Sequence, residues 1–377
     1  MVALISTIVF WLSLGVLAYT FVGYSALMGW LARGRKITPP ALPDDPPAVT
    51  VVVVAHNEES RIGARLENLL GADYPPGKLR VLLVSDGSTD ATVERARAFE
   101  PQRVSVHASP TRAGKAAGLN AALAQATGEI VVFTDARQRF APDAIARLAA
   151  HFADPRIGAV SGALEIEAAS SAAGAGVDAY WRMEKALRSA ESRFDSCIGC
   201  TGAIYAIRRA LFTPIPADTL LDDVVIPMLI AATGARVIHD SDALAFDPQT
   251  LEPASEQRRK QRTLAGNFQM LVRYPGWLLP SRHRLWWQLL SHKYLRLAAP
   301  VLLVTTFAAN LALAAEPAYR AILAGHVLFY TAAALGLALR SRRWRVLSLP
   351  AGFVFLNFMT LRGLLYFLSH RDRSGWK

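Results

Sequence analysis

Apolar residues along this chain form long runs at its two ends and short runs in its middle. The first long run extends from Val2 to Leu31 and contains no charged residue. Three more long runs lie near the other end, at 294–315, 321–339 and 346–368. A helix of about 20 apolar residues crosses a hydrocarbon core about 30 Å thick, so both ends of the chain predict membrane-spanning helices.

A cleaved signal peptide is the competing interpretation of the first run. Signal peptides begin with basic residues and have a shorter apolar core, whereas this run begins uncharged and is followed by Arg33, Arg35 and Lys36. Basic residues beside a membrane helix favour the cytoplasmic side. We therefore expect an uncleaved helix over residues 1–36 with its N-terminus outside.

The last run is a weaker candidate for a spanning helix because it contains Pro350, Asn357 and Arg362. If all four runs cross, the basic tail 370–377 ends outside, against the tendency of basic residues to stay in the cytoplasm. A re-entrant or interfacial position is the alternative. We predict a membrane region over 293–377, with the path of its last run open.

Between the apolar ends, short β-branched runs alternate with longer helical patterns. The β-branched runs are Val51–Val54, Val81–Val84 and Ile130–Phe133, and the helical patterns are Glu58–Leu70 and Ala113–Ala126. This alternation predicts an α/β domain over 49–275 with a mainly parallel sheet flanked by helices. The proline-rich segment 37–48 predicts a stiff linker before it. After it, 276–292 mixes tryptophans with basic residues, which is typical of a helix lying flat on a membrane.

Composition and charge agree with a membrane protein. Of the 377 residues, 52% are hydrophobic, and the mean hydropathy is +0.24. A net charge of +11 would also suit a nucleic-acid-binding protein, but the basic residues cluster beside the apolar runs. Anionic lipid headgroups are therefore the expected partner, and no nucleic acid is expected. Cys197 and Cys200 form a lone CxxC, which favours free thiols over a zinc site or a disulfide.

Polar residues follow the first two predicted strands. His56 and Glu58 come after the first, and the sequence SDGSTD, with Asp86 as its first aspartate, ends the second. Ligands of open α/β sheets bind at the carboxyl ends of the strands, so both loops should line one site. Asp86 can accept hydrogen bonds from a nucleotide base or ribose, and Gly87 permits close backbone approach. A turn or helix-capping aspartate is the alternative interpretation of Asp86.

Two further charged residues fall at corresponding places in the pattern. Lys115 stands between glycines at the start of a predicted helix, where it suits a diphosphate, although a single lysine is more often a solvated surface residue. Asp135 follows the third predicted strand. A carboxylate there can hold Mg²⁺ or Mn²⁺ against a diphosphate and so stabilise a leaving group.

The ordered motifs HNE, SDGSTD, GKAAGLN and FTDA resemble those of family 2 glycosyltransferases with the GT-A fold, and the resemblance covers roughly residues 49–267. The flanking helices resemble those of polysaccharide-synthase-like members. The resemblance implies nucleoside contacts from Ala55, His56, Glu58 and Asp86, with Lys115 near the diphosphate. It also makes Asp135 the first aspartate of the DxD metal motif. Arg137 stands where the second aspartate is expected, so the metal would rest on Asp135 alone, or Arg137 would partly replace its charge by pairing with phosphate.

Later motifs imply acceptor and base residues. The segment around Gly202 resembles the acceptor-side loop of the family, although a glycine-rich turn before a core strand explains it equally well. Asp222 and Asp223 resemble the family's ED motif, with Asp223 as the general base and Asp222 beside it on the acceptor side. An aspartate pair at a helix N-terminus is also a common cap.

The segment at 256–267 occupies the place of the QxxRW motif of processive synthases. Arg262 keeps the guanidinium that would grip the donor diphosphate, while Arg259 replaces the glutamine and would also lie on the donor side. Thr263 replaces the tryptophan that lines the acceptor channel, which weakens the case for polymerisation. A basic helix on acidic headgroups is the alternative.

Together these features predict an inverting transferase that moves a sugar from a nucleotide sugar, expected to be a UDP-sugar, to a glycan or lipid-linked acceptor in cell-envelope or extracellular polysaccharide synthesis. The expected location is a bacterial inner membrane with the catalytic domain in the cytoplasm, where polysaccharide assembly partners could join it. One alternative is transfer of a single sugar to a polyprenyl-linked lipid. Another is a catalytically weak nucleotide-binding scaffold, for which Arg137 is the main argument.

Overall fold

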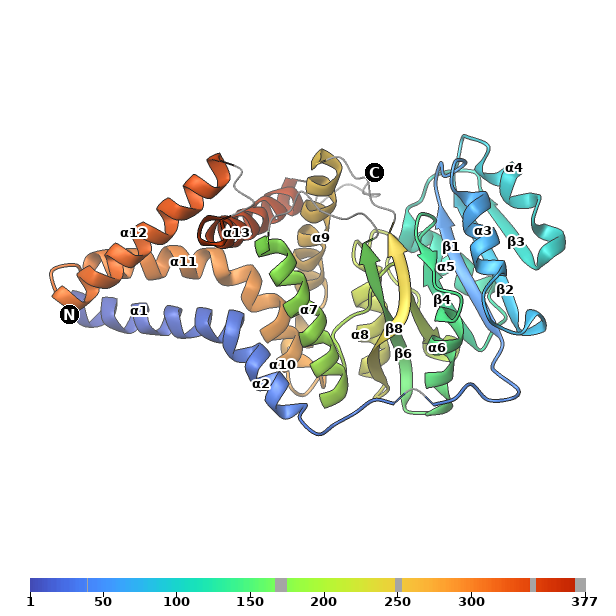
Figure 1. Cartoon of the computed structure of the whole chain (residues 1–377), viewed down its shortest axis with the longest axis horizontal. Coiled ribbons are helices and arrows are strands. Elements are labelled where there is room, and N and C mark those ends of the chain that lie inside the picture. The colour runs from blue at the N-terminus through green and yellow to red at the C-terminus, as the bar shows by residue number, and fades with distance from the viewer. Residues whose placement is uncertain (39, 167–174, 248–252, 340–343, 370–377) are drawn as a thin grey trace.

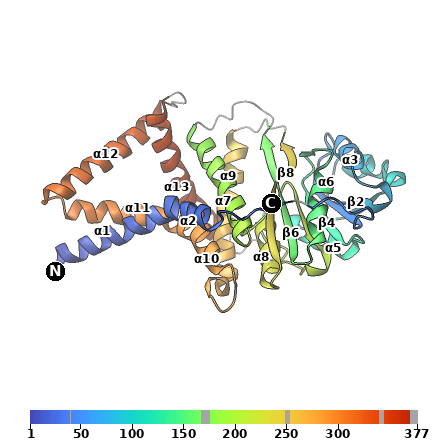
Figure 2. The ribbon, with the colours of Figure 1, turned by 60° about the horizontal axis from the view of Figure 1, so that its bottom comes forward.

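The computed structural model describes residues 1–38, 40–166, 175–247, 253–339 and 344–369. An α/β domain lies at one end of the molecule and long helices lie at the other (Figure 1). Helices α7 (Ala175–Phe194), α9 (Pro253–Arg273) and α10 (Trp286–Leu289) lie between them. Figure 2 shows the same division from a second direction. The two parts predicted from the hydrophobic pattern are therefore spatially separate.

The described part of the domain contains one eight-stranded sheet of order β3-β2-β1-β4-β7-β6-β8-β5. The strands are β1 (Val49–Ala55), β2 (Leu79–Asp86), β3 (Val104–Ser109), β4 (Ile130–Thr134), β5 (Arg139–Phe140), β6 (Ile157–Ile166), β7 (Tyr205–Arg208) and β8 (Arg236–Asp247). Strands β3, β2, β1 and β4 are mutually parallel, and β7 joins antiparallel to both β4 and β6. The parallel half brings the carboxyl ends of β1, β2 and β4 to one edge.

Alternate residues of the strands enter two cores. Val52 packs with Leu119 and Ala122 of α5 (Lys115–Gln125) on one face of the sheet. Val51 and Val53 pack on the other face with α3 (Ile62–Leu70) and α6 (Ala144–Ala150). Because successive side chains of a strand point to opposite faces, an uninterrupted valine run fits a strand buried on both sides. The small helix α4 (Thr92–Arg97) follows β2, and α8 (Asp222–Ala232) packs in the first core.

Four helical segments of the described chain are long and apolar enough to cross a membrane. They are Val2–Leu31, which comprises α1 (Val2–Ala18) and α2 (Tyr24–Leu31); Trp286–Ala312, which ends in α11 (Leu295–Ala312); α12 (Pro317–Ala338); and α13 (Arg345–Ser369). They correspond to the four predicted apolar runs. The tail 370–377, on which the topology argument depended, lies outside the described residues.

The structure differs from the expected surface helix in the segment 276–292. Residues Pro275–Leu278 form a short 3₁₀ turn, and the next helix begins only at Trp286, where it continues into the second spanning segment. Trp277 is buried and stacks on Tyr274, with ring centroids 4.2 Å apart. Trp277 in this segment therefore packs within the protein.

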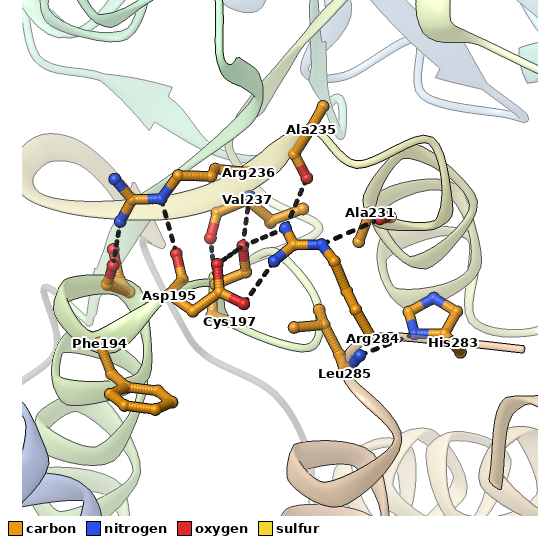
Figure 3. A network of polar contacts seen from close by, with 12 residues as sticks. Phe194, Asp195, Cys197, Ala231, Ala235, Arg236, Val237, His283, Arg284 and Leu285 are labelled. Carbon is orange, nitrogen blue, oxygen red and sulfur yellow. Dashed lines mark hydrogen bonds and ion pairs between the residues drawn. The ribbon is translucent and has the colours of Figure 1, made fainter. Parts of the chain in front are cut away.

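Arg284 shows how this segment is attached to the domain (Figure 3). Its guanidinium donates to the backbone oxygen of Ala235 at 2.7 Å and to the hydroxyl of Ser196 at 2.9 Å, and it pairs with the Asp195 carboxylate. Arg236 of β8 donates to the backbone oxygen of Asp195 at 2.9 Å. These contacts join the end of α7, strand β8 and the entrance to the membrane helix.

Two spanning segments each contain a π-helical turn, at Tyr19–Gly23 and Leu290–Tyr294. The two turns contact each other, because the Tyr19 and Ser291 hydroxyl oxygens are 2.8 Å apart. The Trp287 indole N–H also donates to the Tyr19 hydroxyl at 2.9 Å. A π-helical turn has one residue more than an α-helical turn and is frequent at functional sites.

Candidate active site

The loops after β1 and β2 are tied together by Asn57. Asn57 has a φ of 55°, in the left-handed region that asparagine tolerates better than most residues. Its backbone N–H donates to the Ser88 hydroxyl at 3.1 Å, and its side-chain oxygen accepts the N–H of Thr89 at 2.9 Å. Asn57 was not among the predicted site residues, although an asparagine just beyond a buried strand was a signal.

Asp86 anchors the loop that leads to Lys115. Its two carboxylate oxygens accept the backbone N–H groups of Ala113 at 2.6 Å and Gly114 at 2.8 Å. At Gly87, whose φ is 64°, a side chain would approach the backbone nitrogen of Arg112 to 2.5 Å. Only glycine fits this approach. The buried Asp86 thus has a positioning role, and its contact with a nucleoside stays a prediction.

The other predicted nucleoside residues lie in the same loops. His56 places its Nδ1 atom 2.7 Å from the backbone oxygen of Asp86, so the ring spans the ends of β1 and β2. Glu58 pairs with Arg61 at 3.0 Å on the more exposed side. Ala55 is buried at the end of β1, and its contact with a nucleoside stays a prediction.

Lys115 brings two predicted site carboxylates together. Its ammonium lies 2.9 Å from Asp135 Oδ1 and 3.4 Å from Asp222 Oδ2. Burial lowers the pKa of Lys115, but attraction to Asp135 and Asp222 outweighs burial and raises it overall. Burial raises the pKa of Asp135, and Lys115, Arg259 and Arg137 together bring it below its ordinary value. The lysine is therefore charged, and it links the end of β4 to the start of α8.

Arg137 forms an ion pair at 2.7 Å with the buried carboxylate of Asp247, and it also favours the charged form of Asp135. The described residues contain no group of three or more His, Cys, Asp or Glu side chains arranged to hold a metal ion. Mg²⁺ is often bound by one or two carboxylates together with substrate phosphates. Asp135 is partly exposed and fits such a site, in which the donor would supply the remaining ligands.

Asp223 and Gly202, both predicted to lie on the acceptor side, face each other in the structure. A Cβ atom added to Gly202 would lie 2.9 Å from Asp223 Oδ2, and the N–H of Cys200 donates to the Asp223 backbone oxygen at 2.8 Å. Burial and the adjacent Asp222 carboxylate raise the pKa of Asp223 to about 6, although Lys115, Lys293 and Arg188 oppose the change. A carboxylate with this pKa is suited to accept a proton near neutral pH.

Gly202→Ala should reduce turnover by tenfold or more, because the added methyl group must displace the Asp223 carboxylate. A misplacement of about 1 Å at a reacting group can cost about 100-fold in rate. The measurement is kcat of the purified variant, with its thermal unfolding temperature as the test of folding. Gly63→Ala is the matched control, since nothing lies within 4 Å of the added atom there. Unchanged kcat in Gly202→Ala would contradict the placement of Asp223.

The predicted site residues of α9 are exposed, and only one has an effect on the cluster. Arg259 acts on the charge of Asp135, whereas Arg262 projects from the same helix with no hydrogen bond or ion pair to any other described side chain.

Tyr205 was not predicted. Its buried ring stacks on Phe133, with centroids 4.6 Å apart, and its hydroxyl has no hydrogen-bond partner in the described chain.

Residues 50–213 match the family model described as glycosyl transferase family 2. An N-acetylglucosaminyltransferase of Rhizobium meliloti (strain 1021) is 32% identical over 256 residues, covering 59% of this chain and 58% of that protein. A beta-monoglucosyldiacylglycerol synthase of Synechocystis sp. is 36% identical over 118 residues, covering 30% of this chain and 25% of that protein. The matches thus span less than two thirds of these relatives' own length.

One solved structure is similar over nearly the whole length. It is a mannosyltransferase from Pyrobaculum calidifontis in complex with GDP-Man and Mn²⁺, with a TM-score of 0.72 and 26% identity. The similarity covers 99% of this chain and 100% of that one, so it includes the helices as well as the domain. It confirms the predicted GT-A architecture.

Proposed function

This chain belongs, through residues 50–213, to glycosyl transferase family 2, and from that premise we propose an inverting transferase that moves a sugar from a nucleotide sugar to a glycan or lipid-linked acceptor. The catalytic domain would lie on the cytoplasmic side of a bacterial inner membrane, where nucleotide sugars are made. The basic residues after the first spanning segment support that orientation.

The observation that carries this proposal is the arrangement of charge at the sheet edge. Lys115 lies between Asp135 and Asp222, and Asp223 follows Asp222 with a pKa raised to about 6. A cation suited to the donor phosphates and a base suited to the acceptor hydroxyl are thus present in one cluster. A nucleotide-binding scaffold would need the first of these and not the second.

In the proposed reaction, Lys115 binds the donor diphosphate and Arg259 adds positive charge beside Asp135, while Arg262 reaches the diphosphate from the exposed side of α9. Asp223 removes the proton of the acceptor hydroxyl. The hydroxyl oxygen bonds to the anomeric carbon as the bond from that carbon to the phosphate oxygen breaks, and its electron pair leaves on the nucleoside diphosphate. Direct displacement with one base inverts the anomeric configuration. Bound at Asp135, Mg²⁺ or Mn²⁺ would neutralise charge on the leaving group.

Transfer of a single sugar to a lipid-linked acceptor is the second candidate outcome. It is supported by Thr263, which stands where processive synthases have the channel tryptophan, and by the similarity of part of the chain to a glycolipid synthase. Contact with polysaccharide assembly partners stays a separate proposal.

The test of the proposed function is release of nucleoside diphosphate by the detergent-purified full chain. The donors are UDP-N-acetylglucosamine, UDP-glucose and GDP-mannose, each with Mg²⁺, Mn²⁺ or EDTA and with bacterial lipid extract as acceptor source. We expect turnover of one donor, with UDP-sugars favoured, and loss of most activity in EDTA. Binding of a donor without turnover under any of these conditions would favour the scaffold interpretation.

A further inference from the structure

Two cations that the proposed reaction does not use lie beside the proposed base. Arg188 of α7 donates to the Thr201 hydroxyl at 2.6 Å, and Thr201 immediately precedes Gly202, which faces Asp223. Lys293 comes from the π-helical turn at the start of the second spanning segment. Both are close enough to Asp223 to favour its charged form. Across the described ranges, neither cation forms an ion pair within 4.0 Å with a carboxylate.

The neighbouring carboxylates are engaged by other groups. Glu184 and Glu191 lie on the same face of α7 as Arg188, at helical spacing. His292 bridges them, at 2.7 Å from Glu184 and 2.9 Å from Glu191. Arg296 also donates to Glu184, at 2.8 Å. This network fixes the π-helical turn against α7, and it engages both carboxylates, so that within the described chain neither Arg188 nor Lys293 forms an ion pair with them.

The position of Lys293 in its spanning segment is the one expected of a side chain at the level of lipid headgroups. Lys293 lies near the domain end of the segment Trp286–Ala312, shortly after Trp286 and Trp287. Tryptophan is enriched where a spanning helix leaves the hydrocarbon region, and lysine near a helix end reaches the phosphate level. An anion held at this level and beside Asp223 can therefore belong to a lipid.

We propose that Arg188 and Lys293 bind the phosphate ester of a lipid-linked acceptor, whose hydroxyl is thereby presented to Asp223. This inference rests on the proposed function and selects a lipid-linked acceptor over a free glycan. Cations beside a general base stabilise its carboxylate and so weaken it as a base. A bound phosphate offsets that effect, and it also fixes the distance between the membrane surface and the reacting hydroxyl.

The test uses farnesyl phosphate and farnesol as probes, because they share a chain and differ in the phosphate. Binding to the purified full chain is measured by quenching of tryptophan fluorescence. Farnesyl phosphate should bind at least tenfold more tightly than farnesol. Arg188→Gln and Lys293→Gln should each raise the Kd of farnesyl phosphate about tenfold, since each removes one charged hydrogen-bond donor. The Kd of farnesol should be unchanged in both variants. Lys293→Arg should retain most of the affinity.

Lys185→Gln is the matched control, because Lys185 lies on the same helix but pairs with Glu165 at 2.6 Å. Thermal unfolding reports whether each variant folds. If Lys293→Gln does not fold, Arg188→Gln and the comparison of farnesyl phosphate with farnesol still test the proposal. Equal binding of farnesol and farnesyl phosphate, or wild-type affinity in the glutamine variants, would overturn the proposal. Competition by nanodiscs of phosphatidylglycerol, and not phosphatidylcholine, would instead assign the site to bulk lipid phosphate. Donor turnover together with failure of these tests would leave the proposed function standing.

Discussion

Asp223→Asn is expected to abolish sugar transfer while donor binding persists. The substitution keeps the size of the side chain and removes its ability to accept a proton, and general-base catalysis contributes about 10²–10⁴ in rate. Asp223 follows the start of α8, and its carboxylate faces Gly202 instead of anchoring a strand or a loop. A fall of at least 100-fold in kcat, measured as nucleoside diphosphate release, should therefore occur without a comparable rise in the Kd of the donor.

The pH dependence of the wild-type enzyme is a second readout of the same residue. Because burial and Asp222 raise the pKa of Asp223 to about 6, kcat/KM should fall about tenfold per pH unit below that value as the base is protonated. The residual activity of Asp223→Asn should lack this limb. Asp143→Asn is the control, since Asp143 is a half-exposed partner of Arg147 at 2.6 Å outside the cluster. An acid limb that survives in Asp223→Asn would assign the base to another group.

Lys115→Met should lower kcat/KM by about 100-fold or more, because it removes a preorganised positive charge from the place where the diphosphate leaves. Asp135 and Asp222 then lose the cation that lies between them, at 2.9 and 3.4 Å. Their mutual repulsion should raise the pKa of one of them and lower the thermal unfolding temperature. The measurements are donor Kd, kcat/KM and the unfolding curve.

Lys78→Met is the matched control for this substitution. Lys78 also forms an ion pair, at 2.8 Å with Asp45, but it lies directly before β2, at the opposite end of that strand from the polar loops. An exposed pair of this kind contributes at most about 1 kcal/mol, so turnover and stability should be nearly unchanged. Equal effects of the two substitutions on kcat/KM would show that Lys115 contributes only to the overall charge of the protein and does not contact the donor.

Local pattern was sufficient to predict three of the four parallel strands, β1, β2 and β4, whereas β3 was not among the named runs. The valine run Val51–Val54 and the polar residues after it identified the first strand and its loop, and Lys115 begins α5 as expected. These features depend on neighbours in sequence, since strand ends and helix starts have local signatures. Asp135 and Asp223 were named from motifs, and the structure adds that Lys115 and Gly202 are their neighbours in space.

Long-range pairs were beyond sequence reasoning. Arg137 was considered as a replacement for the second metal ligand and as a partner for phosphate, and its partner in the structure is Asp247, 110 residues later. The tryptophans and basic residues of 276–292 were interpreted as a surface helix, whereas Arg284 binds the turn after α7 and the approach to β8. Arg188 and Lys293 were missed because more than 100 positions separate them and neither belongs to a motif.

The paired π-helical turns at Tyr19–Gly23 and Leu290–Tyr294 lie where the spanning helices meet the α/β domain. At this place the contacts depend on how far each helix is rotated about its own axis. One inserted residue rotates everything beyond it by about 100° relative to an uninterrupted α-helix. His292 and Lys293 lie inside the second turn, so the extra residue decides which side chains point toward α7 and which toward lipid. Substitutions within these spans preserve the rotation of the helix about its axis, whereas an insertion or deletion of a single residue changes that rotation. The spanning helices therefore set the orientation of the side chains that face α7, in addition to anchoring the domain.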